Sequence, residues 1–435
     1  MNLRPFELSL VIIFGGLALL ALVMLAWYEP PENPNNDGPQ IEGSVTIWGT
    51  LPAESVNGAL KQISGTSESF RNVRYRSISP ERFDAELLDA LAERRQPDLI
   101  LISHKRLVQH RSKLYPISYE SFPLRDYRNL YVDGAELFSR PDGIYAFPIA
   151  VDPLMMYWNR NLLADLNYLT PPATWEELVG EYAPAATVRD DRRRLQRSAV
   201  AMGTYDNIRN PVATISMLFT QGGSQLVREE RDQYWVMLNE SVGGGAPLTD
   251  ALRFYTRFAD ASNPLYSWNR SQPEDRQQFV REELAFYFGF GSEARRIAEL
   301  NPNLNFDIAE VPQGATASVR RTYGRFYGLA LLRTSNNPVA AQQVLYQLAN
   351  SQVATGIANG YGMAPPHVSV IAAGSNDIYG RLIYTSVPIA RGWLNPDRDQ
   401  TEQVFADAIA NINANRRDPV GAADDITTLL RNRYE

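Results

Sequence analysis

Apolar and aromatic residues occupy almost every position from Ile144 to Trp158, a pattern typical of extended chain buried on both faces. Asp152 and Pro153 interrupt this run. Proline donates no backbone hydrogen bond and disfavours helical geometry in the residue before it, so a central strand is not expected to continue through it. The pattern therefore predicts two strands joined at a kink, where the chain passes from one sheet to another.

A turn and a helix are predicted after this run. The polar residues 159–161 end the second strand. Thr174 then precedes Glu177 by three positions, which is the spacing of a capping box, in which each side chain accepts a hydrogen bond from the backbone of the other residue. We expect a helix to begin at Thr174.

Strands and helices alternate in the part of the chain before the run. Strands are predicted at 44–48, 71–77 and 97–102, with helices from about residue 55 and over 79–94 between them. This order predicts a parallel, doubly wound sheet, and such sheets bind ligands beyond the carboxyl ends of their strands. Trp48 lies at one such end, and His104 and Arg106 lie in the turn that follows another.

The pattern after residue 180 predicts a second set of elements. A strand at 198–203 leads through a polar loop to a helix that begins at Pro211. Later elements are predicted as helices at 248–258, 338–349 and 401–412 and strands at 306–312 and 323–332.

Several motifs resemble those of one known family. Tyr145-Ala146-Phe147-Pro148, Tyr157-Trp158-Asn159 and the Pro171-Pro172 to Leu178 segment resemble the crossover of family 1 extracellular solute-binding proteins, the maltose-binding-like receptors of ABC importers. The strand exit Pro97–Arg106 and the G-x-x-P loop at 359–366 are similar to the same family, and the matching order runs from about Val45 to Leu430.

The resemblance implies an α/β, two-lobed periplasmic-binding-protein type II fold, each lobe a doubly wound sheet flanked by helices. Lobe 1 would comprise residues 43–151 plus 322–378, and lobe 2 residues 152–321 plus 379–435. The length of 435 residues agrees with two domains, because one hydrophobic core rarely serves a chain of this size.

The N-terminal region predicts a membrane anchor. Leu8 to Trp27 carries no charge, and a helix rising ~1.5 Å per residue over this stretch would span a hydrocarbon core of ~30 Å. A cleaved signal peptide is the alternative, but Met24-Leu25-Ala26 before Trp27 is a poor cleavage context. We therefore expect residues 1–28 to form a transmembrane helix with a cytoplasmic N-terminus, residues 29–42 a Pro- and Asn-rich linker, and the folded part to be extracellular or periplasmic.

Composition argues against several function classes. The net charge is −7 and the basic residues are scattered, which does not fit nucleic-acid binding. The chain has no cysteine, and its three histidines are not spaced as a metal pair, so no metal site and no cofactor are expected. No G-x-S-x-G, phosphate-loop or HExxH motif occurs, so the protein is not predicted to be an enzyme; a glycosidase with paired carboxylates is a remaining alternative.

The resemblance to the family supplies candidate ligand-binding residues. Sugar receptors stack pyranose rings on aromatic faces and bind hydroxyls with polar side chains. Residues that match cleft positions of the family are Trp48, His104, Arg106, Asp152, Asn207, Asn210, Phe290, Ser292, Arg325 and Trp393.

Asp152 is the strongest candidate, because an acid inside an apolar run needs a partner, which a ligand hydroxyl or an arginine would supply. We expect it to face the cleft at the hinge. Ile102, Lys105 and Ser292 stand where maltose receptors carry other residues, so maltodextrin specificity is in doubt while the receptor assignment is not.

The function that follows is a membrane-tethered receptor that captures a carbohydrate or similar small polar solute by lobe closure and delivers it to ABC permease subunits. A sensor or scaffold ectodomain with the same fold and no transport role is the alternative.

Overall fold

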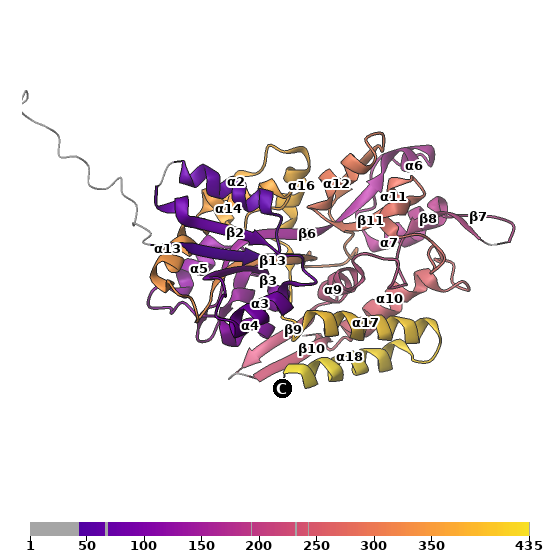
Figure 1. The fold of residues 1–435 in the computed structure, drawn as a ribbon. Coiled ribbons are helices and arrows are strands. Elements are labelled where there is room, and N and C mark those ends of the chain that lie inside the picture. Colours follow the sequence, from indigo (N-terminus) through magenta and orange to yellow (C-terminus); the bar gives the residue numbers. More distant parts are fainter. Residues whose placement is uncertain (1–42, 66–67, 193, 231–232, 242, 435) are drawn as a thin grey trace, which may run out of the picture.

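One continuous sheet connects the two halves of the protein (Figure 1). In the computed structural model, which describes residues 43–65, 68–192, 194–230, 233–241 and 243–434, its strand order is β2-β1-β3-β13-β6-β11-β8-β7, with β12 beside β6 and β14 beside β13. The strands are β1 (Val45–Gly49), β2 (Val73–Ser77), β3 (Leu99–Ser103), β4 (Ser139–Arg140), β5 (Gly143–Ile144), β6 (Phe147–Asn159), β7 (Val188–Arg189), β8 (Leu195–Val200), β9 (Ser224–Glu230), β10 (Gln233–Ser241), β11 (Leu284–Phe290), β12 (Phe306–Ala309), β13 (Thr322–Leu331) and β14 (Ala390–Arg391).

Helices cover the sheet on both faces. In Figure 1, α2 and α14 lie above the strands at the N-terminal end of the sheet, and α3 and α4 lie below them. The α-helices are α2 (Ala53–Ser64), α3 (Phe83–Ala92), α4 (Leu107–His110), α5 (Leu124–Leu130), α6 (Arg160–Asp165), α7 (Trp175–Glu177), α8 (Ala183–Ala186), α9 (Pro211–Gln221), α10 (Pro247–Thr256), α11 (Asp275–Val280), α12 (Glu293–Leu300), α13 (Pro338–Leu348), α14 (Ser351–Gly360), α15 (Val368–Ala373), α16 (Ile378–Ser386), α17 (Arg398–Asn413) and α18 (Pro419–Tyr434).

The apolar run forms one strand rather than two. β6 is continuous and buried along its whole length, so the predicted break at Asp152-Pro153 is wrong. Its first part pairs with β13 as far as Pro153, and its second part pairs with β11 and β12 from Leu154 onward. The carbonyl of Pro153 accepts a hydrogen bond of 2.9 Å from the N–H of Gly291, just beyond the end of β11. The missing N–H of the proline therefore falls outside the ladder, and the strand tolerates it.

The other local predictions are largely confirmed. β1 pairs in parallel with both β2 and β3, as the alternating pattern predicts. Thr174 and Glu177 form the reciprocal capping box at the start of α7. In α3 the buried face is formed by Phe83, Leu87 and Ala90, and Leu88 is exposed.

A hairpin and a terminal helix join the second half of the protein to the first. β9 and β10 pair antiparallel and pack against α18, where the rings of Tyr234 and Tyr434 stack with centroids 4.6 Å apart. Glu229 on β9, with a side chain only 1% exposed, accepts from Arg111 at 2.6 Å and lies 3.4 Å from Arg140. These arginines come from the segments around α4 and β4, so the hairpin contacts the first half through buried ion pairs.

The predicted anchor at Leu8–Trp27 lies outside the described residues. Among the helices that the structure describes, none is long and apolar enough to cross a membrane.

Candidate functional site

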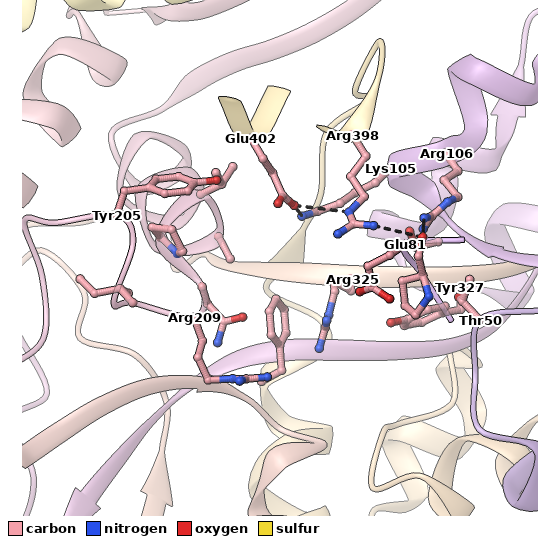
Figure 2. Close-up of a pocket in the computed structure, with 18 of the residues that line it drawn as sticks. Thr50, Glu81, Lys105, Arg106, Tyr205, Arg209, Arg325, Tyr327, Arg398 and Glu402 are labelled. Carbon is pink, nitrogen blue, oxygen red and sulfur yellow. Dashed lines mark hydrogen bonds and ion pairs between the residues drawn. The ribbon is translucent and has the colours of Figure 1, made fainter. Parts of the chain in front are cut away.

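A cavity of about 710 Å³ lies between the two halves of the sheet (Figure 2). Its walls come from the segments that follow β1 and β3, the segment before α3, the loop before α9, the end of β11, the middle of β13 and the first turns of α17. The side chains and backbone that line it belong to Thr50, Leu51, Pro80, Glu81, Ser103, Lys105, Arg106, Tyr205, Asp206, Ile208, Arg209, Asn210, Pro211, Val212, Ala213, Glu274, Phe290, Arg325, Tyr327, Tyr361, Arg398 and Glu402.

Arg325 stands at the centre of this cavity (Figure 2). It lies opposite Asp152 in the β13–β6 pairing, and its Nη2 donates to Asp152 Oδ2 at 2.9 Å. Its guanidinium carbon lies 3.5 Å from the centroid of the Phe290 ring, which is a close cation–π contact. The two strands that connect the lobes thus present one positively charged side chain to the cavity.

Asp152 is fully buried behind Arg325 and does not line the cavity, contrary to the prediction that it faces the cleft. Besides Arg325 it accepts hydrogen bonds from the backbone N–H of Ser292 at 3.0 Å and from its Oγ at 2.7 Å. Burial raises the pKa of the Asp152 carboxyl, against the opposing charge of Arg325. Both of its oxygens have partners inside the protein and its side chain is not exposed, so Asp152 does not reach the cavity in this structure.

The structure brings some of the predicted residues to the cavity and not others. Those that line it are Arg106, Asn210, Phe290 and Arg325. Arg106 is only 3% exposed, because Asp84 holds its Nε at 3.0 Å and the carbonyl of Pro80 also accepts from it. Its role there is chiefly to fix the β3 exit against α3.

The remaining predicted residues have partners within the protein. Trp48 lies under the guanidinium of Arg76, 4.6 Å from the ring centroid, and the side chain of Asn207 donates to the backbone carbonyls of Asn269 and Gln272. Trp393 is buried and donates from Nε1 to Ser216 Oγ at 3.0 Å. With Asp152, Ser292 and His104, these residues do not line the cavity but lie behind its walls, and their contact with a ligand stays a prediction.

His104 is fully buried, and its Nδ1 accepts from the N–H of Phe326 at 3.1 Å. Burial, helped by the neighbouring charge of Lys105, lowers the pKa of its imidazole to about 3. It is therefore a neutral side chain that ties β3 to β13 and does not offer a proton to the cavity.

Sequence reasoning missed the part of the cavity wall built by α17. Arg398 and Glu402 face Lys105, whose Nζ lies 3.6 Å from Glu402, and Arg398 donates to the carbonyl of Pro80 at 3.3 Å. Burial lowers the pKa of Lys105 to about 8. The pair at positions 398 and 402 has helical i,i+4 spacing, but nothing local indicates that this turn reaches the exit of β3.

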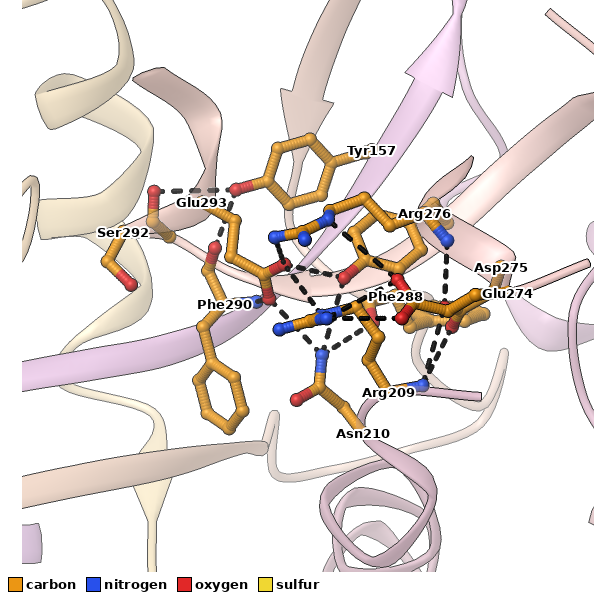
Figure 3. A network of polar contacts seen from close by, with 12 residues as sticks. Tyr157, Arg209, Asn210, Glu274, Asp275, Arg276, Phe288, Phe290, Ser292 and Glu293 are labelled. Carbon is orange, nitrogen blue, oxygen red and sulfur yellow. Dashed lines mark hydrogen bonds and ion pairs between the residues drawn. The ribbon is translucent and has the colours of Figure 1, made fainter. Parts of the chain in front are cut away.

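An ion-pair network supports the opposite wall (Figure 3). Glu293 accepts from the backbone N–H of Phe290 at 2.9 Å and from Asn210 Nδ2 at 3.2 Å, while Tyr287 donates to it at 2.7 Å. Arg209 contacts Glu293 at 3.8 Å and Glu274 at 3.3 Å. The network fixes the start of α9 relative to the end of β11.

Among the residues that the structure describes, no group of three or more histidine, aspartate or glutamate side chains could hold a metal ion.

The comparison with protein families matches the chain to "Bacterial extracellular solute-binding protein" over residues 72–353. The protein belongs to this family. A sequence search among curated proteins found no match.

Solved structures of solute-binding proteins share the fold of this family member at low sequence identity. The cyclic α-maltosyl-1,6-maltose binding protein of Arthrobacter globiformis superposes with a TM-score of 0.71 at 15% identity, covering 90% of this chain and 98% of that one. The sugar-binding protein MalE of Xanthomonas citri gives a TM-score of 0.70 at 17% identity, with 90% and 97% covered. A solute-binding protein of Thermotoga lettingae bound with α-D-tagatose gives 0.64 at 16% identity, with 90% and 100% covered. At such identities the likeness establishes the two-lobed α/β fold.

Proposed function

We propose that the protein is a receptor that binds a carbohydrate between its two lobes and delivers it to the permease of an ABC transporter. The observation that carries this proposal is the cavity itself: it lies where β6 and β13 pass between the halves of the sheet, and polar side chains from both halves converge on it. Solved structures of similar fold include a cyclo/maltodextrin-binding protein complexed with maltotetraose and a solute-binding protein bound with α-D-tagatose, which supports a sugar as the class of ligand.

The proposed mechanism is closure of the lobes about the strands that join them. Lobe 1 would comprise 43–151 plus 322–378 and lobe 2 152–321 plus 379–435, with β6 and β13 as the connections. Ligand bound to both walls stabilises the closed state, since it has more contacts there than in an open one. The permease would then distinguish loaded from empty receptor by the closed shape.

We further propose that residues 1–28 remain in the mature protein as a membrane anchor and that 29–42 tether the lobes outside the cytoplasm. An uncharged stretch from Leu8 to Trp27 supports the anchor. Intact-mass analysis of the membrane-extracted protein tests it: a mass that includes the N-terminus is expected, and a chain beginning near Tyr28 would exclude a retained anchor.

Ligand binding is tested by thermal unfolding of the purified full-length chain against a panel of neutral and acidic mono- to tetrasaccharides. A ligand that binds only the folded state raises the melting temperature by mass action, by an amount that grows with its concentration. We expect at least one sugar to do so. Absence of a shift with every sugar would exclude a carbohydrate receptor, and a shift with a different class of solute, such as an amino acid, would show what the protein binds instead.

A further inference from the structure

The carboxylates that line the cavity are either paired with basic side chains or exposed to solvent. Glu402 lies between Lys105 at 3.6 Å and Arg398 at 3.5 Å, and Glu274 lies 3.3 Å from Arg209. The other lining acids, Glu81 and Asp206, are exposed to solvent. Among the described residues, no carboxylate that lines the cavity is therefore both shielded from solvent and free to accept a hydrogen bond from a sugar hydroxyl.

Arg325, in contrast, retains donor capacity at the centre of the cavity. Its side chain is 29% exposed, and its described side-chain hydrogen bond runs from Nη2 to Asp152. A guanidinium carries five N–H donors, so the exposed part of Arg325 has donors beyond the one that Asp152 uses. This part is suited to an acceptor that brings two oxygens or a full negative charge.

The start of α9 adds donors of the same kind. Val212 and Ala213 belong to its first turn and line the cavity. The backbone N–H groups of a first helical turn have no partner within the helix. The side chain of Asn210 does not cap them, and the first turn contains no acid. The positive end of the helix dipole thus adds to the positive charge of Arg325 across one cavity.

One aromatic ring of the cavity wall, that of Phe290, is covered by a cation. Arg325 lies over the ring of Phe290 at 3.5 Å, so a pyranose cannot stack on that face without displacing the guanidinium. A neutral sugar also needs acceptors for its hydroxyl protons, and the two lining carboxylates that are not fully exposed, Glu402 and Glu274, are paired with basic side chains.

We propose that the ligand is a carbohydrate bearing an anionic group, a carboxylate or a phosphate, which Arg325 binds with the first turn of α9. This inference rests on the proposed function and narrows its ligand class. Asp152 then acts as a positioning residue that aligns the guanidinium from behind.

Calorimetric titration of the full-length chain with matched sugars tests the proposal. Each neutral sugar is compared with its uronate and its 6-phosphate, for example glucose, glucuronate and glucose 6-phosphate, and the galactose series, followed by di- and trisaccharide pairs. At least one anionic member is expected to bind ten times or more tighter than its neutral counterpart, and the uronate and phosphate arms show which group is used.

Arg325→Lys keeps a positive charge beside Asp152 but removes the planar fork of donors. We expect this substitution to weaken binding of the anionic sugar about ten- to a hundredfold, because a charge-assisted hydrogen bond is lost. The melting temperature of the variant without ligand should stay close to that of the original chain. The matched control is Arg253→Lys, the same substitution in an exposed arginine of α10 whose pair with Asp250 faces solvent. This control should change neither the affinity for the anionic sugar nor the melting temperature without ligand.

Three outcomes distinguish failure of the anionic-ligand proposal from failure of the proposed receptor function. If neutral sugars bind as tightly as their anionic counterparts, the proposal of an anionic ligand is wrong, while the proposal of a carbohydrate receptor still holds. Tight anionic binding that Arg325→Lys does not weaken would overturn the role of Arg325. Binding of no sugar, neutral or charged, would overturn the proposed function and this inference with it.

Discussion

His104 makes the stability of the protein depend on pH in a way that the structure allows to be worked out. The imidazole is fully buried between β3 and β13, near the cationic groups of Lys105 and Arg325 and the hydroxyl of Tyr323. A Cβ placed on Gly392 would lie 2.7 Å from its Nε2, so little room remains for a hydrating water. Burial and these charges lower the pKa of the imidazole from its ordinary 6.5 to about 3.

The sign follows from the protons bound in each state. Between pH 6.5 and about 3 the unfolded chain protonates His104 while the folded chain does not, so the free energy of unfolding falls as the pH falls through this window. From pH 7.5 to 4.5 this single group should remove about 3 kcal/mol, since each pH unit below 6.5 corresponds to a tenfold difference in protonation. Above pH 7 it should contribute almost nothing.

Urea unfolding of the full-length chain and of His104→Asn at pH 7.5, 6.5, 5.5 and 4.5 measures this contribution. Asparagine can still accept from the N–H of Phe326 but does not titrate. We expect His104→Asn to be less stable at pH 7.5 yet to lose about 3 kcal/mol less than the original chain on going to pH 4.5. The pKa of His367 is also lowered by burial, but its contribution is present in both proteins and cancels in the difference. Parallel pH profiles would show that His104 is not held neutral by burial.

Three further substitutions have predictable effects on stability or on molecular shape. Asp152→Asn should lower the stability of the ligand-free protein by about 2–4 kcal/mol in urea unfolding, because it removes the partner of Arg325, which is itself partly solvated; a melting curve like that of the original chain would contradict this pairing. Glu229→Gln should weaken the attachment of the hairpin to Arg111 and expand the ligand-free protein in small-angle scattering, whereas an unchanged radius of gyration would show that these ion pairs do not hold the lobes together. Thr174→Ala should cost about 1 kcal/mol through loss of the capping box, and a cost near zero would show that water replaces it.

Asp152 was the strongest candidate from the sequence, but the structure places Arg325 in the cavity wall instead. The need of Asp152 for a partner follows from the sequence, because an acid within an apolar run cannot stay unpaired. The identity of that partner does not follow, since Arg325 lies 173 positions away in the chain. The register of β6 against β13 pairs the two residues and leaves Arg325, not Asp152, in the cavity.

The sequence by itself determined those features that depend on neighbours along the chain. The parallel β1–β3 unit, the helix start at Thr174 and the start of α9 at Pro211 were predicted correctly, because period, capping and the missing proline N–H are local properties. The ordered motifs likewise indicated the family to which the chain belongs.

Tertiary structure alone decided how these elements meet. Local reasoning placed a break at Pro153, but the proline lies where a ladder ends, so β6 runs unbroken from one half of the sheet to the other. It also gave no indication that Glu402 would reach Lys105 or that Glu229 would reach Arg111. Such contacts depend on strand register and packing between segments distant in the chain, and these give no periodic signal to read in the sequence.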